Sequence, residues 1–460
     1  VWDFAEANPF SAAGGNISMF VARVTDVLES LPPAESSGRS RQVDATASVN
    51  GLAQPLICTD PPYYDNIGYA DLADFFYVWL RRSLAPIYPD LFGTLLTPKA
   101  QELVATPHRF GGSQEEARRF FEEGLGKAFA QMRAAQHPGY PLTLFYAFKQ
   151  AEAGEAENDD GTPAFASTGW ETMLEGLVAS GLAVTGTWPM RTEGSGRVVA
   201  RGTNALASSI LLVCRPRPAD APLATRREFV SALKRELPDA LRKLQHGNIA
   251  PVDLAQAAIG PGMAVFSRYS KVLDASGASL SVRAALGLIN QALDEVLADQ
   301  ESEYDNATRW AVAWFEQYGA TDGPFGMAET LSTAKDTAVS VLEATGIVRA
   351  RGGKVRLLQR SELPADWDPS SDPRLTVWEV MQHLIRRLDQ DGEQGAAELL
   401  AKIGGLGEVA RDLAYRMYVV SERKRWTQDA LACNSLVVAW PEIARIAAAA
   451  PTRASQRRLL

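Results

Sequence analysis

The sequence predicts an α/β fold for residues 1–218 and a mostly helical architecture after them. Two patterns support this prediction. Up to about residue 218, short apolar runs bounded by turn residues alternate with longer stretches in which apolar residues recur every three or four positions. After Pro216-Arg217-Pro218, almost every segment is rich in Ala, Leu, Arg and Glu, which favour helix.

The first part is expected to form a sheet with helices on its faces. Pro55-Leu56-Ile57-Cys58 is short, apolar and bounded by turn formers, which suits a buried parallel strand. Residues 69–84 carry apolar and aromatic side chains at helical spacing, so we expect a helix with one buried face. Strands expected at 182–188 and 208–214 are joined without a helix and are therefore expected to be antiparallel. The other expected elements are helices at 16–31, 114–135 and 170–179 and strands at Val43-Asp44-Ala45 and 142–148.

The helical part has one exception. Residues 347–358 form two short alternating runs around Gly352-Gly353, which is a strong signal for a β-hairpin. Helices are expected before it at 305–318 and 326–345, so this stretch resembles a winged helix. We therefore divide the chain into a first domain at 1–218, a helical region at 219–302, a winged-helix segment at 303–362 and a helical carboxyl-terminal region at 363–460.

Composition and charge narrow the functional classes. The 460 residues carry a net charge of -9, which argues against a surface that binds nucleic acid all round but is compatible with a local basic groove. No uncharged apolar run approaches the roughly 20 residues that cross a bilayer, and the sequence does not open with a signal peptide. We expect a cytoplasmic protein with no membrane contact.

The cysteines and histidines predict no metal site. Cys58, Cys214 and Cys433 lie far apart without a Cys-x-x-Cys spacing, and the four histidines form no pair with the spacing of metal ligands. We therefore expect neither a zinc site nor a disulfide framework in this segment.

The most informative motif is Asp60-Pro61-Pro62-Tyr63, at the end of the strand expected at 55–58. Loops at the carboxyl ends of parallel strands are where open α/β sheets bind ligands. An amine attached to an aromatic ring is a poor nucleophile because its lone pair is delocalised. The Asp60 carboxylate and the Pro61 carbonyl offer two acceptors for its two hydrogens, and two prolines stiffen the loop.

Aromatic residues extend the motif. Tyr63 offers a face on which a base extruded from a duplex can stack. Tyr64, Asn66 and Tyr69 continue a polar, aromatic loop that can close over such a base, although residues of this kind are also common in solvated turns. The pattern therefore indicates a site for an aromatic amine of nucleic acid.

The run from Thr59 to Arg82 resembles the motif region of a family of bacterial adenine-specific DNA methylases. Residues 3–10 and 186–191 are also similar to that family, so the resemblance covers at least residues 1–218. Full-length members carry a zinc ribbon and often occur beside phage-defence genes. The resemblance implies a Rossmann-like S-adenosylmethionine methyltransferase sheet with an antiparallel last strand, in which Asp60, Pro61, Pro62 and Tyr63 form the catalytic motif.

The cofactor site departs from that family. Its members bind S-adenosylmethionine through a glycine-rich loop after a strand, and this chain has no such loop; residues 8–15 are only similar, with Ala12 in place of the first glycine. Asp44 stands where such enzymes often place a residue near the adenosine, or it is an ordinary turn aspartate. Since the sequence opens on Val1 in mid-pattern, we expect a C-terminal fragment whose cofactor loop and zinc ribbon lie upstream.

Several residues outside the motif are weaker candidates. Trp188 is either a second aromatic wall for the base or core packing, and the core interpretation is favoured. Lys149 and Arg191 either contact a phosphate or are solvated charges. The wing holds a cluster of basic residues that either follows a DNA backbone or contacts protein, namely Arg349, Arg351, Lys354 and Arg356.

The sequence thus predicts S-adenosylmethionine-dependent methylation of the N6 amine of adenine in DNA, within a restriction-modification or phage-defence system. Its expected partners are DNA and other subunits of such a system. One alternative is a non-catalytic DNA-binding or assembly subunit of a defence complex. Another is methylation of cytosine N4 or of an RNA base, because the same two acceptors suit any conjugated amine.

Overall fold

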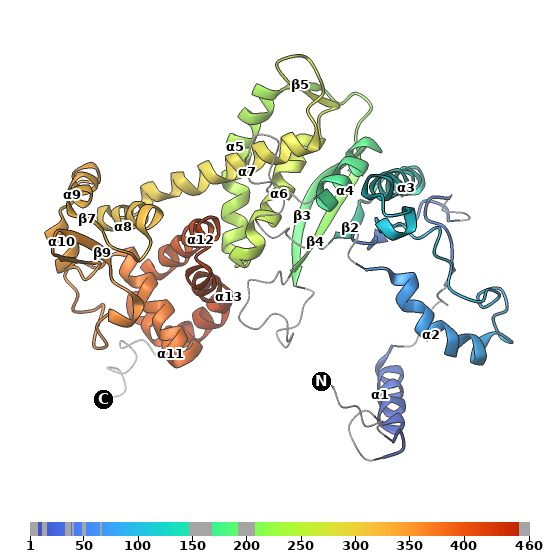
Figure 1. The fold of residues 1–460 in the computed structure, drawn as a ribbon, viewed down its shortest axis with the longest axis horizontal. Helices are drawn as coiled ribbons and strands as arrows, with labels where there is room; N and C mark the ends of the chain where they lie inside the picture. Colours follow the sequence, from blue (N-terminus) through green and yellow to red (C-terminus); the bar gives the residue numbers. More distant parts are fainter. Residues whose placement is uncertain are drawn as a thin grey trace. The chain divides into compact units, whose positions relative to one another are not determined.

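A computed structural model describes residues 8–11, 16–32, 38, 41–47, 52–64, 67–146, 168–191 and 208–449 (Figure 1). The chain divides into two compact units, Val1–Asp44 and Ala45–Leu460. The first unit contains the helix α1 (Ile17–Ser30), which confirms the helix expected at 16–31 and begins where the Asn16 side chain accepts a hydrogen bond from the Met19 amide. The strand expected at Val43-Asp44-Ala45 is wrong, because this short run pairs with no strand and ends in a turn.

The second unit holds a four-stranded mixed sheet. Its strands are β1 (Cys58–Thr59), β2 (Leu142–Tyr146), β3 (Leu182–Arg191) and β4 (Ser208–Pro216), in the order β1-β2-β4-β3. The pair β1–β2 is parallel, whereas β4 runs antiparallel to both β2 and β3. The antiparallel last pair is thus confirmed. The strand expected at 55–58 is shifted to Cys58–Thr59, and the expectation that it is buried is wrong, because Leu56 is 68% exposed and Cys58 is exposed.

Helices bury one face of this sheet (Figure 1). The α3 helix (Gln114–Ala135) and the α4 helix (Thr168–Ala179) contribute to a core that includes Leu142, Leu144 and Tyr146 of β2. Their neighbours in β2, Thr143 and Phe145, are only half-buried, as expected where successive side chains point to opposite faces. Both helices lie where the sequence predicts them.

The α2 helix (Tyr69–Leu84) has the predicted bounds but not the predicted burial. Only Ala70 and Tyr77 are buried in it. Phe75 and Trp79 expose 69% and 60% of their surfaces, so the expectation of one buried apolar face is wrong. Helical spacing shows that apolar residues share a face, but burial depends on what lies opposite.

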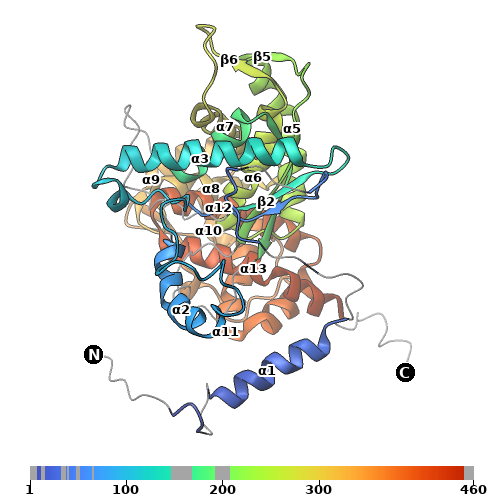
Figure 2. The ribbon, with the colours of Figure 1, turned by 90° about the vertical axis from the view of Figure 1, so that its right-hand side faces the viewer.

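A helical layer follows the sheet. It contains α5 (Arg226–His246), α6 (Pro251–Ser267), α7 (Val282–Asp299) and a 3₁₀ turn at Gln300–Glu303. The short strands β5 (Leu223–Thr225) and β6 (Lys271–Leu273) pair in parallel beside them, a pair that the sequence did not predict (Figure 2). The α6 helix packs on β3 so closely that a Cβ at Gly260 would overlap the Thr187 side chain.

The next stretch has the order helix, strand, helix, helix, hairpin. These elements are α8 (Asn306–Tyr318), β7 (Gly323–Pro324), α9 (Phe325–Ala334), α10 (Val339–Ala344), β8 (Val348–Arg351) and β9 (Lys354–Leu357), with the strands in the order β7-β9-β8. The hairpin is confirmed, and Gly352 and Gly353 have φ values of 61° and 73° at its turn. The single helix expected at 326–345 is wrong, because the chain leaves helical geometry at Asp336, whose φ is 52°.

Three helices complete the described chain: α11 (Val377–Ile403), α12 (Leu406–Lys424) and α13 (Thr427–Ala449). A non-helical Gly392 divides α11 into two segments. Among the described residues, α13 is the one helix long and apolar enough to span a membrane. It packs against α11 and α12 and buries Leu436, Val437 and Trp440, as a core helix does. Two 3₁₀ turns lie at Pro107–Phe110 and Arg360–Glu362.

Candidate active site

The Asp60-Pro61-Pro62-Tyr63 motif forms a tight turn directly after β1. Pro61 is buried, whereas the Asp60 side chain at the carboxyl end of the strand is exposed. The Tyr64 amide donates to the Pro62 carbonyl at 3.2 Å, and the Tyr64 carbonyl accepts from the Ala105 amide at 3.0 Å. Tyr64 has a φ of 49°, a left-handed conformation that costs a residue with a side chain about 1 kcal/mol or more. The two backbone hydrogen bonds of Tyr64 and its left-handed conformation thus fix the shape of the turn.

Beneath the turn lies a column of aromatic rings. The ring of Tyr63 meets Tyr146 edge-on with centroids 5.2 Å apart, and Tyr146 stacks on Trp170 of α4 at 5.4 Å. The Tyr146 hydroxyl donates to the Gly169 carbonyl at 3.1 Å. A Cβ at Gly169 would lie 2.9 Å from the Tyr64 Cβ, so only glycine lets α4 approach the turn this closely. The sequence motif gave no sign of Tyr146, Gly169 or Trp170.

The two polar side chains of the motif bind each other. The Tyr63 hydroxyl donates to Oδ1 of Asp60 at 2.7 Å. Burial, and then this hydrogen bond to a carboxylate, raise the pKa of Tyr63 well above its ordinary value of 10. A hydrogen bond from Ser209 of β4 lowers the pKa of Tyr63 by a smaller amount. The phenol therefore stays protonated, and donates, at every physiological pH.

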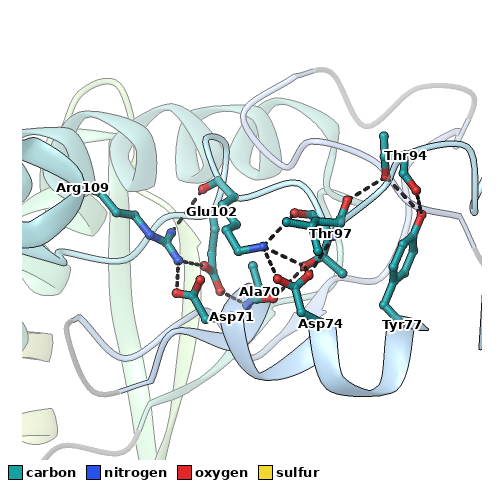
Figure 3. A network of polar contacts seen from close by, with 10 residues as sticks. Ala70, Asp71, Asp74, Tyr77, Thr94, Thr97, Glu102 and Arg109 are labelled. Carbon is teal, nitrogen blue, oxygen red and sulfur yellow. Dashed lines mark hydrogen bonds and ion pairs between the residues drawn. The ribbon is translucent and has the colours of Figure 1, made fainter. Parts of the chain in front are cut away.

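The α2 helix begins just after this turn and is fastened by a polar network (Figure 3). Glu102 accepts a hydrogen bond from the Ala70 amide at 2.8 Å. Arg109 forms ion pairs with Glu102 and with Asp71 of α2, both at 2.8 Å. These contacts hold the first turn of α2 against the loop that precedes α3.

A second part of the network lies one turn further along α2. Lys99 pairs with Asp74 at 2.6 Å, and Thr97 also donates to Asp74. Lys99 first, and then Thr97, lower the pKa of Asp74 to about 2. The Tyr77 hydroxyl donates to the Thr94 carbonyl at 2.8 Å. The polar side of α2 is thus occupied by the 94–109 loop, which leaves its apolar side uncovered among the described residues.

Of the residues predicted to bind the base, Tyr69 lies near Tyr63 and Trp188 is exposed on the sheet. Tyr69 is the first residue of α2, is 46% exposed, and interacts electrostatically with Tyr63. Trp188 is 56% exposed on β3, so the favoured interpretation of Trp188 as core packing is wrong. Its position in β3 places it opposite Leu211, which is only half-buried on the same sheet face.

The remaining four candidates lie outside the described side chains of the second unit. Asn66 and Lys149 lie outside the described residues, as does the side chain of Arg191, the last residue of β3. Asp44 ends the first compact unit and has no strand around it, whereas Asp60 belongs to the second.

Carboxylates neutralise most of the basic wing. Arg349 and Arg356 both pair with Glu362, at 2.8 and 2.5 Å, and Lys354 lies 3.8 Å from Asp322. Glu362 is itself held ionised, because Arg356 lowers its pKa to about 2. Of the four predicted basic residues, Arg351 alone has no ion pair within the part of the chain that the structure describes.

Two hollows in the described part of the chain do not include the motif. One of about 660 Å³ lies between α3 and α4 and is lined by charges of both signs, including Arg118, Glu171 and Arg283. Another of about 290 Å³ lies beside Trp378 and Arg360. We give the motif more weight than either hollow, because it lies at the carboxyl end of a parallel strand and places an exposed carboxylate beside a tyrosine ring. Within the described ranges, no three His, Cys, Asp or Glu side chains are placed to hold a metal ion.

Comparison with known proteins gives one match. The family of a domain of unknown function (DUF8807) matches residues 305–459, which begins just before α8 and runs past α13 but does not include the Asp60 turn. No curated protein and no solved structure matches the chain.

Proposed function

We propose that this chain is the substrate-binding part of a Rossmann-like methyltransferase that methylates the N6 amine of adenine in DNA. The observation that carries the proposal is the Asp60 turn. A stiff loop at the carboxyl end of a parallel strand presents an exposed carboxylate and a tyrosine ring at one point. The antiparallel β4 beside the parallel pair agrees with the sheet that the family resemblance implies.

The residues of this chain would position the amine. Asp60 and the Pro61 carbonyl accept its two hydrogens, which concentrates the lone pair on nitrogen and favours pyramidal geometry. The Tyr63 ring supplies a stacking surface for the extruded base. Tight fixation matters, because an in-line transfer needs the reacting atoms within about 3 to 3.5 Å. Adenine is favoured over cytosine N4 or an RNA base by family resemblance alone.

The described residues do not fit S-adenosylmethionine. The β1 strand pairs only with β2, and no glycine-rich loop follows a strand beside it in the described ranges. We therefore assign the cofactor loop to another stretch of polypeptide. The exposed apolar side of α2 supports this assignment, because a large exposed apolar patch usually marks a contact surface.

The helical region would recognise DNA or other subunits of a defence system, and the protein would act in the cytoplasm. The paired charges of the wing favour subunit contact over DNA contact for that segment. The absence of a glycine-rich cofactor loop from the described residues favours a second candidate, a non-catalytic assembly subunit whose methylase motif is retained without activity. The two candidates differ in one respect: only the first requires Asp60 for methylation.

The test uses cells that express the complete gene, with N6-methyladenine in their DNA mapped by sequencing. We expect methylation at a defined site with the wild-type protein and none with Asp60→Ala. Asp90→Asn serves as the control, since Asp90 is an exposed aspartate beyond the end of α2. Undiminished methylation with Asp60→Ala, or none with the wild type, overturns the proposed function.

A further inference from the structure

The hydroxyl of Tyr63 has a feature that base stacking does not require. Stacking uses the ring, and a phenylalanine would supply it equally. The hydroxyl instead reaches back three residues to Oδ1 of Asp60 at 2.7 Å. Asp60 is exposed, and its side chain has no other hydrogen bond within the described part of the chain. Among the described residues, Tyr63 is therefore the group that restrains this exposed carboxylate.

Tyr63 is itself held firmly. Its ring rests edge-on against Tyr146, which is 1% exposed, stacked on Trp170 and tied to the Gly169 carbonyl. The residue after it is locked in a left-handed conformation. The donor that reaches Asp60 is thus supported by a column of packed rings from β2 and α4.

We propose that the Tyr63 hydroxyl is a positioning group that fixes the Asp60 carboxylate for the amine. It occupies Oδ1 and leaves Oδ2 as the oxygen that accepts a hydrogen from the substrate. An acceptor fixed before the reaction needs no reorganisation during it, which lowers the barrier of the chemical step rather than improving binding. This inference rests on the proposed function and adds a role to the same site.

The kinetic test compares Tyr63→Phe with Tyr63→Ala in the complete protein. Tyr63→Phe keeps the ring but loses the hydrogen bond, so we expect kcat to fall about tenfold, the scale of one hydrogen bond to a charged group. The KM for DNA is expected to stay within about twofold, because binding uses the ring. Fluorescence of 2-aminopurine at the target position reports base extrusion and is expected to persist in Tyr63→Phe and to disappear in Tyr63→Ala. An unchanged or increased kcat in Tyr63→Phe overturns the inference.

A second test needs no catalysis. In protein with ¹³C-labelled tyrosine, the ring Cζ NMR signal of Tyr63 at neutral pH reports the hydrogen bond of the protonated phenol, and it is assigned by its loss in Tyr63→Phe. Because the phenol donates to a charged carboxylate, Asp60→Asn is expected to shift this signal. No change in Asp60→Asn refutes the hydroxyl contact. This shift, together with a wild-type protein that methylates nothing, would instead count against the proposed function alone.

Discussion

The buried carboxyl of Glu379 makes the carboxyl-terminal region sensitive to pH. Glu379 lies in the first turn of α11, is 4% exposed, and accepts a hydrogen bond from the Thr376 hydroxyl at 3.0 Å. Burial, with the nearby charges of Asp372 and Asp305, raises its pKa from 4.5 to about 8. The folded protein therefore keeps a proton that the unfolded chain has lost, and its stability falls as pH rises from about 4.5 to 8.

This gives a quantitative expectation for Glu379→Gln, which imitates the neutral acid. At about 1.4 kcal/mol per pH unit, the interval between 4.5 and pH 7 corresponds to roughly 3 kcal/mol of stability that the variant regains. Near pH 5 the gain shrinks to about 1 kcal/mol or less. Calorimetry of the complete chain at both pH values measures the difference, with Glu393→Gln, an exposed position on the same helix, as the control. A gain of equal size at the two pH values would refute the reasoning.

Two further predictions concern packing and charge. Gly260→Ala forces a Cβ into Thr187, so we expect the free energy of unfolding to fall by about 1 to 3 kcal/mol. Gly287→Ala lies on an exposed turn of α7 with open space around it, so we expect the free energy of unfolding to rise by about 0.5 to 1 kcal/mol. Urea unfolding of both variants measures these changes, and equal effects would contradict the prediction. If the wing follows DNA, Arg351→Ala is expected to lower the salt slope of DNA binding by about one and Arg356→Ala by less, because Glu362 already neutralises Arg356. Identical slopes for wild type and Arg351→Ala would exclude a phosphate contact by this residue.

Local signals explain what the sequence could predict of the fold. The bounds of α2 and α3 follow from helical spacing, and α3 starts at the N-cap Ser113, whose side chain accepts from the Glu116 amide. The hairpin at Gly352-Gly353 follows from turn chemistry. The break at Asp336 carries no Pro or Gly, and aspartate adopts the left-handed conformation found there more readily than most residues. Such a break is invisible to a periodic pattern.

The candidate site likewise contains residues that a sequence motif reveals and residues that only folding brings to it. Asp60 to Tyr63 are contiguous, so a motif reveals them. Tyr146 and Trp170 reach the same place through strand pairing and helix packing, over 80 and 100 residues further along the chain. The exposure of Trp188 was mispredicted for a related reason: a strand pattern does not state which of its faces a helix covers.

The two segments that flank the Asp60 turn differ in how much surface they bury. On its β1 side, the turn joins the sheet and the ring column of the core. On its other side it joins a sixteen-residue helix held chiefly by carboxylate contacts at Asp71, Asp74 and Glu102, with two buried residues of its own. Segments with so little buried surface exchange their amide hydrogens and admit proteases through local opening, without global unfolding. We therefore expect α2 to open locally before the sheet does, which would let a ligand reach the Asp60 turn from the α2 side while the sheet stays folded.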